Sequence, residues 1–208
     1  NRAGNRATTN QLTGGGGIAM YGRIEAGTTV VSRNLVQSNT AADWSGGLQM
    51  GSFFTTASTW ESGIGTVENN IFDANDAPNG GGGHTEGTLV RIRNNTFVNN
   101  TADFGGALYL EQGNTADVPT LANDLFTFNT ADQAASGGGL YVSGTTNPVV
   151  RYNDLYGNSP DNVDGGKTDS SYIGINGNIS VDPLYANRTG SDYHLTAVSP
   201  AMDVGENA

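Results

Sequence analysis

The feature that most constrains this chain is a repeated pattern in which an apolar residue is followed three positions later by asparagine. Segment 93–103, RNNTFVNNTAD, is nearly copied by segment 122–132, ANDLFTFNTAD. The closing asparagine recurs at spacings of 36, 25, 29 and 29 residues, at Asn39, Asn75, Asn100, Asn129 and Asn158. Self-similarity of this kind is typical of repeat architectures, in which each copy stacks on its neighbours.

A pair of glycines follows most copies of the pattern. The pairs begin at Gly16, Gly46, Gly105, Gly138 and Gly165. Short β-rich runs separated by Gly and Asn turns suit coils whose strands stack about 4.8 Å apart in parallel sheets. The 31 glycines and the lack of apolar residues at helical spacing disfavour helices. We therefore expect an all-β fold, a right-handed parallel β-helix of about six to seven coils.

Equivalent residues of successive coils should form columns, which can be written down directly. An aliphatic column consists of Val31, Val67, Ile92, Leu121, Val150 and Ile175. A second apolar column, rich in phenylalanine, consists of Val36, Phe72, Phe97, Phe126 and Leu155. Between them lies a polar column of Asn34, Asn70, Asn95, Asp124, Asn153 and Asn178. We interpret it as an internal asparagine ladder, whose side chains bond from coil to coil and to the backbone of the bend.

The period predicts a single β-helix domain over residues 1–208, with regular coils over about 14–182. Segment 51–65 is expected to be an insertion that lengthens one coil. Segment 183–208 should cap the last coil and hide its sheet end from other chains. The apolar residues expected to form this cap are Leu184, Tyr193, Leu195 and Met202. The start of the chain offers no comparable cap, which suggests a piece of a larger protein or an end that stacks on a neighbour.

The acidic composition limits the partners. With 20 acidic and 9 basic residues the formal net charge is −11, and the one lysine is Lys167. No basic stripe is therefore present to bind nucleic acid or anionic lipid. No run of apolar residues is long enough for a transmembrane helix. Without cysteine, the chain has no thiolate metal site, thiol nucleophile or disulfide.

The Phe-x-x-Asn motif at 97–100 and the Gly-Gly-Ala-Leu motif at 105–108 resemble the repeats of polymorphic outer-membrane autotransporter adhesins. They also resemble the broader right-handed parallel β-helix repeat proteins of bacterial cell surfaces. Segments 178–185 and 199–205 are similar to the closing part of many secreted β-helix proteins. The resemblance covers most of 14–206. It implies the fold more specifically than the activity, since these families include adhesins, surface fibres and polysaccharide lyases.

From this resemblance we expect a non-catalytic structural or adhesin-type module that is secreted or exposed at the cell surface, where a polysaccharide or surface ligand could bind. One alternative is a carbohydrate-active β-helix, either a polysaccharide lyase or hydrolase or a sugar-binding module. A second alternative is the subunit of a self-assembling extracellular filament, with coils that continue end to end between chains. No cofactor is required by these functions, although calcium could bind.

The enzyme alternative has weak candidate residues. By resemblance, β-helix lyases use acidic calcium ligands with a basic residue near the proton removed, and hydrolases use paired carboxylates. The candidates are Asp73, Asp76, Arg91 and Arg93, which this hypothesis expects in one groove. An ion pair between Arg93 and Glu68 on the neighbouring coil is the simpler interpretation. His84 and His194 lie in separate segments and suggest no catalytic triad.

Aromatic and acidic residues supply the remaining candidates. Tyr109 and Tyr141 occupy equivalent positions after a glycine pair and should stack, either for sugar binding or as ordinary packing between coils. The candidate sugar-binding residues are Tyr109, Tyr141, Trp44 and Trp60. Like charges one coil apart repel unless they cap turns or share a cation. This applies to Asp103, Asp132 and Asp161, which are the candidate calcium ligands.

Overall fold

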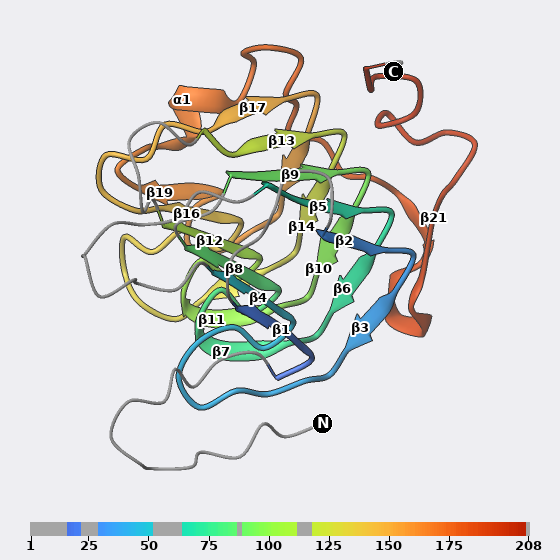
Figure 1. Ribbon diagram of the computed structural model, residues 1–208. Helices are drawn as coiled ribbons and strands as arrows, with labels where there is room; N and C mark the ends of the chain where they lie inside the picture. Colours follow the sequence, from blue (N-terminus) through green and yellow to red (C-terminus); the bar gives the residue numbers. More distant parts are fainter. Residues whose placement is uncertain (1–15, 22–28, 52–63, 87–88, 112–117, 207–208) are drawn as a thin grey trace, which may run out of the picture.

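The computed structural model describes residues 16–21, 29–51, 64–86, 89–111 and 118–206, and it is a parallel β-solenoid (Figure 1). Every sheet in the coiled part has parallel strands, and neighbours in each sheet come from successive coils. The expected all-β coiled architecture is therefore confirmed. None of the helices in these ranges is long and apolar enough to cross a membrane.

Each full coil passes through four sheets in turn. The valine sheet contains β2 (Thr29–Ser32), β5 (Ile64–Glu68), β9 (Leu89–Arg93), β13 (Thr120–Ala122) and β17 (Val149–Arg151). The phenylalanine sheet contains β3 (Leu35–Gln37), β6 (Ile71–Asp73), β10 (Thr96–Val98), β14 (Leu125–Thr127) and β18 (Asp154–Tyr156). The short sheet contains β7 (Asp76–Asn79), β11 (Thr101–Phe104) and β15 (Thr130–Ala131). The six-stranded sheet contains β1 (Ile18–Tyr21), β4 (Leu48–Gly51), β8 (Gly83–Glu86), β12 (Leu108–Glu111), β16 (Leu140–Val142) and β19 (Val163–Gly165).

The solenoid has about 4 turns, so the expectation of six to seven coils was wrong. Four passages of the chain separate the first and last strands of each five-stranded sheet. The last rung ends at Gly165, after which the chain forms α1 (Asp169–Tyr172) instead of another coil. Ile175 is accordingly 46% exposed and does not continue the aliphatic column, because it follows this helix outside the coiled core.

The rest of the two apolar columns is confirmed. The aliphatic residues Val31, Val67, Ile92, Leu121 and Val150 are buried. The rings of Phe72, Phe97 and Phe126 are fully buried and stack with centroids 4.6 and 5.1 Å apart. The six-stranded sheet closes the core with inward side chains that include Leu48, Met50, Leu108, Leu110, Leu140 and Val142. A solenoid therefore needs only a thin apolar interior, which explains the modest apolar content of 36%.

The asparagine ladder at the corner between the valine and phenylalanine sheets is confirmed. Asn70 Oδ1 accepts the backbone N–H and the side-chain amide of Asn34, both at 3.0 Å, and Asn70 Nδ2 donates to the Val31 carbonyl. The same pattern joins Asn70 to Asn95 and Asn153 to Asn178. These bonds satisfy backbone groups that the bend takes out of the sheets.

A second ladder follows at the next corner, where sequence reasoning had recognised the recurring asparagine but not its hydrogen bonds. Its members are Asn39, Asn75, Asn100, Asn129 and Asn158, with Asn162 as the last acceptor. The residue before the ladder asparagine is left-handed at both corners of a coil, for example Asn94 with φ 56° and Asn99 with φ 54°. Asparagine tolerates this backbone better than most side chains.

The glycine pairs lie where backbones of successive coils meet. At Gly82 a Cβ atom would lie 2.6 Å from the Ala107 carbonyl oxygen and 2.9 Å from the Phe97 ring. A side chain there would collide with the next coil, so the repeat requires glycine.

The last coil is covered by α1, not by the C-terminal tail. Tyr172 of α1 is buried with the core, and Asp169 accepts hydrogen bonds from Val163 N and Asn162 Nδ2 at 2.7 and 3.2 Å. The tail instead forms an antiparallel hairpin of β20 (Tyr185–Asn187) and β21 (Asp192–Leu195), joined by the 3-10 helix Arg188–Gly190.

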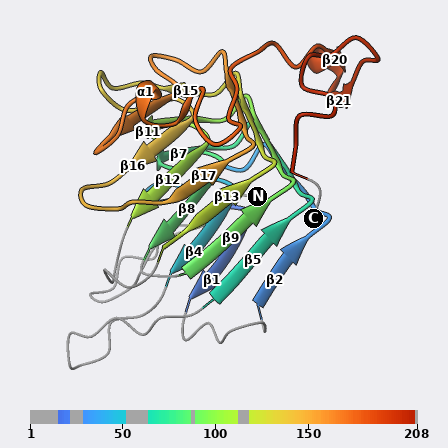
Figure 2. The same cartoon turned by 90° about the horizontal axis from the view of Figure 1, so that it is seen from above.

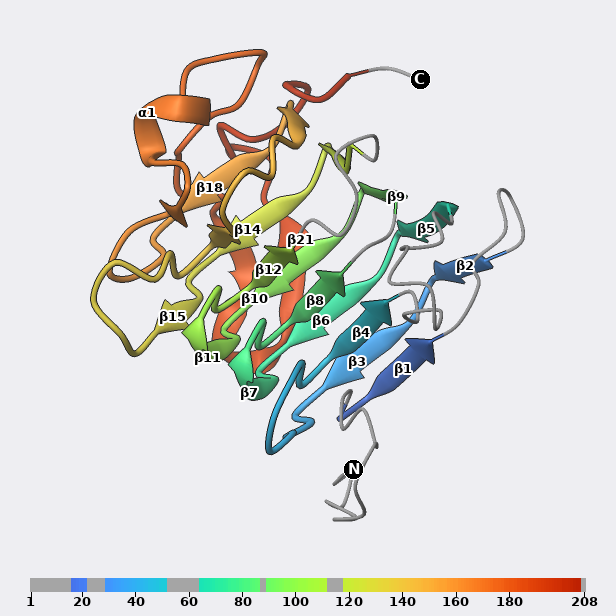
Figure 3. The same cartoon turned by 60° about the vertical axis from the view of Figure 1, so that its left-hand side comes forward.

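This hairpin lies outside the coils, along the phenylalanine sheet (Figures 2 and 3). Ser191 Oγ bonds to Asp73, and the Tyr193 hydroxyl accepts from Asn99. The expected cap of Leu184, Tyr193, Leu195 and Met202 over the last coil is therefore not formed. Leu184 and Met202 are 38% and 41% exposed, because the tail turns back along the solenoid.

Candidate functional site

The outer face of the six-stranded sheet gathers most of the aromatic residues singled out in the sequence. Strand pairing aligns Gln49, His84, Tyr109, Tyr141 and Asp164 as one row across successive strands. Side chains alternate along a strand, and the neighbours Leu48, Leu108 and Leu140 are buried inside. The row therefore projects from the outer face. The predicted stacking of Tyr109 on Tyr141 is confirmed, with centroids 4.9 Å apart and ring planes 25° apart.

Trp44 and His84 extend this stack. Trp44 lies in the loop before β4, and its ring stacks on His84 at 4.9 Å with an interplanar angle of 12°. His84 meets Tyr109 edge to face, also at 4.9 Å. We call Trp44, His84, Tyr109 and Tyr141 the aromatic row. Three of the four predicted sugar-binding residues thus lie together, while Trp60 lies outside the described residues.

His84 is fully buried in this row. Its Nδ1 lies 2.8 Å from Nε2 and 3.0 Å from Oε1 of Gln49, so the amide can donate to the ring in one tautomer, with the ring proton on Nε2, or accept from it in the other. Nε2 is 3.4 Å from Glu111 Oε2 and has no better-aligned partner in the part of the chain that the structure describes. Burial lowers the pKa of His84 below its ordinary value, against the opposing effect of Glu111, so the ring is neutral near pH 7.

Two glutamates lie beside the aromatic row. Glu86 ends β8 and Glu111 ends β12, and the two residues are register partners on adjacent strands. Both are partly exposed. Burial raises the pKa of Glu86, and the neighbouring Glu111 carboxylate adds to the increase. The site therefore combines partly exposed aromatic rings, phenol hydroxyls and two carboxyl groups on one face of the sheet. Sequence reasoning missed Glu86 and Glu111 and gave His84 no role in catalysis, because outward positions differ from coil to coil.

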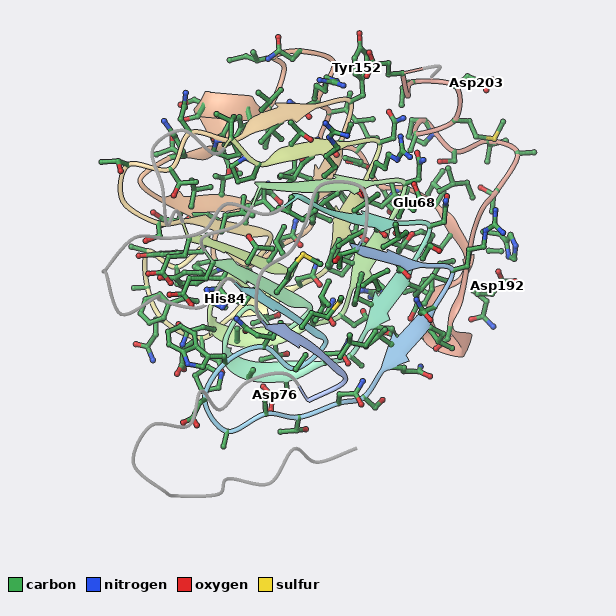
Figure 4. All side chains as sticks on the ribbon, viewed as in Figure 1. Glu68, Asp76, His84, Tyr152, Asp192 and Asp203 are labelled. Atoms are coloured by element: carbon green, nitrogen blue, oxygen red, sulfur yellow. The ribbon has the colours of Figure 1, made fainter. Side chains whose placement is uncertain are left out.

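The weak catalytic candidates are not brought together. Asp73 belongs to the phenylalanine sheet, Asp76 to the short sheet, and Arg91 and Arg93 to the valine sheet. In Figure 4 Asp76 lies far from Glu68, the residue of the valine sheet that pairs with Arg93. The expectation of a single groove was wrong, because the three strands face different directions within each coil.

Asp73 and Arg93 instead have structural partners. Asp73 is buried and accepts hydrogen bonds from Gln37 at 2.6 Å and Asn99 at 3.1 Å, as well as from Ser191. Arg93 Nη2 lies 2.7 Å from Glu68 Oε2, which confirms the ion pair between neighbouring coils. Its side chain is 53% exposed, so the pair contributes little to stability.

The aspartate column offers no complete metal site in the described ranges. Asp76, Asp103 and Asp132 line a shallow hollow over the short sheet, while Asp161 is exposed on the following coil. Burial raises the pKa of Asp76, and the carboxylates of Asp132 and Asp103 contribute further. No group of three His, Cys, Asp or Glu side chains described by the structure could hold a metal ion. Calcium binding by Asp103, Asp132 and Asp161 therefore stays an untested hypothesis.

Two buried carboxylates border a small pocket beneath the C-terminal tail. Asp124 and Asp154 line it together with Leu125, Tyr152 and Leu195, among others. Burial raises the pKa of each aspartate to about 7, and in each the Oδ2 atom has no hydrogen-bond partner. Asp124 Oδ1 belongs to the ladder and Asp154 Oδ1 accepts from Val181 N, so both groups mainly hold structure.

In comparisons with known proteins, no family model matches the chain, and no curated protein or solved structure shows significant similarity to it.

Proposed function

We propose that the outer face of the six-stranded sheet binds a carbohydrate chain, and that the solenoid is the rigid support that presents it. The observation that carries this proposal is the aromatic row together with Glu86 and Glu111 on one face of the sheet. Aromatic surfaces beside precisely placed hydrogen-bonding groups are usual in sites for ligands that are partly apolar and rich in hydroxyls.

The arrangement favours contacts along the edge of the row. Tyr109 and Tyr141 cover one face of each other's ring, so their edges and hydroxyls are the parts available to a ligand. The row advances by about 4.8 Å per coil, a step close to the length of one sugar unit in an extended chain. Successive sugar hydroxyls could therefore meet equivalent groups on successive coils.

The charge of this face favours a neutral or amino sugar over a uronate. Glu86 and Glu111 border the row, Asp164 ends it, and the whole chain carries a net charge of −11. A polyuronate would bring further carboxylates to this surface and would be repelled. The proposed ligand therefore differs from the uronate chain on which a lyase would act.

The location and assembly of the protein belong to the same proposal. The motif resemblance to autotransporter adhesins and secreted β-helix proteins supports an extracellular or cell-surface module with an adhesin-type binding face. The filament alternative is less well supported, because α1 and Tyr172 cover the last coil and would have to move before another chain could stack there.

Calorimetry and affinity electrophoresis with neutral glucans, mannans, chitin oligosaccharides and polygalacturonate would test the proposal. We expect binding to a neutral or amino-sugar chain that is lost in Tyr141→Ala and Tyr109→Ala. Tyr152→Ala is a matched control, since Tyr152 lies at the corner after β17, away from the six-stranded sheet. Absence of binding to all four classes, or equal loss in the control, would overturn the proposal.

A further inference from the structure

The two glutamates beside the aromatic row have a geometry that goes beyond binding. Glu86 and Glu111 are direct register partners on adjacent parallel strands and project from the same face. Adjacent strands are about 4.8 Å apart. From backbones at this spacing, two glutamate side chains on one face can bring their carboxyl groups to the separation of about 5–5.5 Å used by glycosidases that retain anomeric configuration.

The two carboxyl groups have different surroundings, as an acid and a nucleophile require. Glu111 faces the Nε2 atom of His84, at 3.4 Å. Burial raises the pKa of Glu86, and the charge of the neighbouring Glu111 adds to the increase. The raised pKa suits Glu86 to the role of proton donor.

His84 is an independent sign that this face is built around Glu111. Its ring is fully buried, held between Trp44 and Tyr109 and fixed through Nδ1 by Gln49. The remaining nitrogen, Nε2, is left without a well-aligned partner and points toward the carboxylate. This nitrogen is therefore free to interact with the Glu111 carboxylate when that side chain moves closer.

We propose that Glu86 and Glu111 form the acid and nucleophile of a retaining glycoside hydrolase, acting on the carbohydrate that the aromatic row binds. The inference rests on the proposed carbohydrate-binding function. Glu111 attacks the anomeric carbon while the bond to the leaving oxygen breaks and Glu86 gives that oxygen its proton. Water then attacks the glycosyl–Glu111 ester, loses a proton to Glu86 and releases the sugar with retained configuration, which restores both carboxyl groups.

His84 is a positioning residue in this scheme, since it acts through Glu111. Its Nε2–H would orient the Glu111 carboxylate and stabilise its charge while the ring stays neutral. Tyr109 lies on β12 with Glu111, and Tyr141 lies on β16 of the next coil, so both would hold the sugar beside the carboxyl pair.

The activity test uses the full chain with the polysaccharides of the binding assay and with dinitrophenyl glycosides of glucose, galactose, mannose and N-acetylglucosamine. We expect new reducing ends, a product of retained configuration by NMR, and a loss of about 10²–10⁴-fold in Glu111→Gln and Glu86→Gln. Glu68→Gln is the control, because Glu68 lies on the valine sheet and pairs with Arg93. Unchanged binding with no bond cleavage would overturn the hydrolase and leave the binding proposal standing.

Three further measurements separate catalytic roles from structural ones. A 2-deoxy-2-fluoro glycoside should leave a covalent adduct on Glu111. Azide should restore turnover of the dinitrophenyl glycosides by Glu86→Ala, and the product should be a glycosyl azide. His84→Gln should lower kcat and shift the acidic limb of its pH profile while the fold, followed by circular dichroism, stays intact. An inverted product, or an adduct elsewhere, would overturn the assignment.

Discussion

Asp124 replaces asparagine in the ladder, and its Oδ1 accepts the backbone N–H and the side-chain amide of Asn95 at 2.8 and 2.9 Å. The other oxygen, Oδ2, is buried without a partner. In Asn95 the equivalent atom is an amide nitrogen that donates to the carbonyls of Val67 and Arg93. An ionised aspartate lacks this donor, whereas a protonated one can imitate it. Burial accordingly raises the pKa of Asp124 to about 7.

The raised pKa of Asp124 predicts a stability that falls as the pH rises. The folded state favours the protonated carboxyl, and the unfolded state ionises near the ordinary value of 3.8. Stability should therefore decrease from about pH 4 to pH 7 and then level off, by about 4 kcal/mol in total. Asp124→Asn should remove the contribution of Asp124 and be the more stable form at pH 8, while a fall of the same sign due to Asp154, whose pKa is also raised to about 7, remains. Urea denaturation at pH 4 and pH 8 measures the free energy of unfolding of both proteins, and Asp132→Asn, which changes an exposed aspartate, is the control. Equal stability of Asp124→Asn and wild type at pH 8 would contradict the prediction.

The second ladder should be costly to interrupt. Asn100 donates to the Phe72 carbonyl and to Asn129 Oδ1 at 2.9 Å each, and its own oxygen accepts twice from Asn75. Asn100→Ala leaves several of these buried groups unpaired, so we expect a loss of about 3–5 kcal/mol in the free energy of unfolding. Asn34→Ala makes the same change at an exposed ladder position and should cost about 1 kcal/mol. Similar losses in the two variants, measured by urea denaturation, would mean that burial of the ladder is unimportant.

The phenylalanine stack should behave as a close-packed core. Phe97 lies between Phe72 and Phe126 and is completely buried. Phe97→Ala should lower the free energy of unfolding by about 3–5 kcal/mol, because the cavity cannot close between two fixed coils. Phe97→Leu should cost clearly less, since Leu155 fills the same position in a later coil. Chemical denaturation of both variants measures the difference, and an equal loss would argue against a volume effect.

The C-terminal hairpin should detach when its anchor is removed. The Asp73 carboxylate accepts hydrogen bonds from Ser191 as well as from Gln37 and Asn99. Asp73→Ala should therefore speed amide hydrogen exchange in segment 185–195 while the strands of the core keep their protection. Asp192→Ala is the control, because that side chain is exposed and bonds to His194 within the hairpin. Unchanged exchange in the hairpin after Asp73→Ala would show that its other contacts, such as the Tyr193–Asn99 hydrogen bond, are enough to hold it.

The inward-facing part of the fold was predictable position by position. Val67, Ile92 and Leu121 repeat in sequence because each occupies the same narrow interior site one coil further along. The ladder asparagines repeat for the same reason, since every bend must satisfy the same backbone groups. Ile175 was misassigned because its spacing fits the column, while the glycine and polar residues around it belong to the turn after α1.

The sequence by itself therefore determined the coiled architecture, its interior columns and its bends, because stacking imposes one local environment on equivalent residues. Tertiary structure decided the candidate site and the course of the tail. Outward side chains such as His84, Glu86 and Glu111 obey no repeat, and their meeting depends on strand register between coils. Tyr193 and Ser191 likewise dock on Asp73 and Asn99, a surface that exists only after residues far apart in sequence have been stacked side by side.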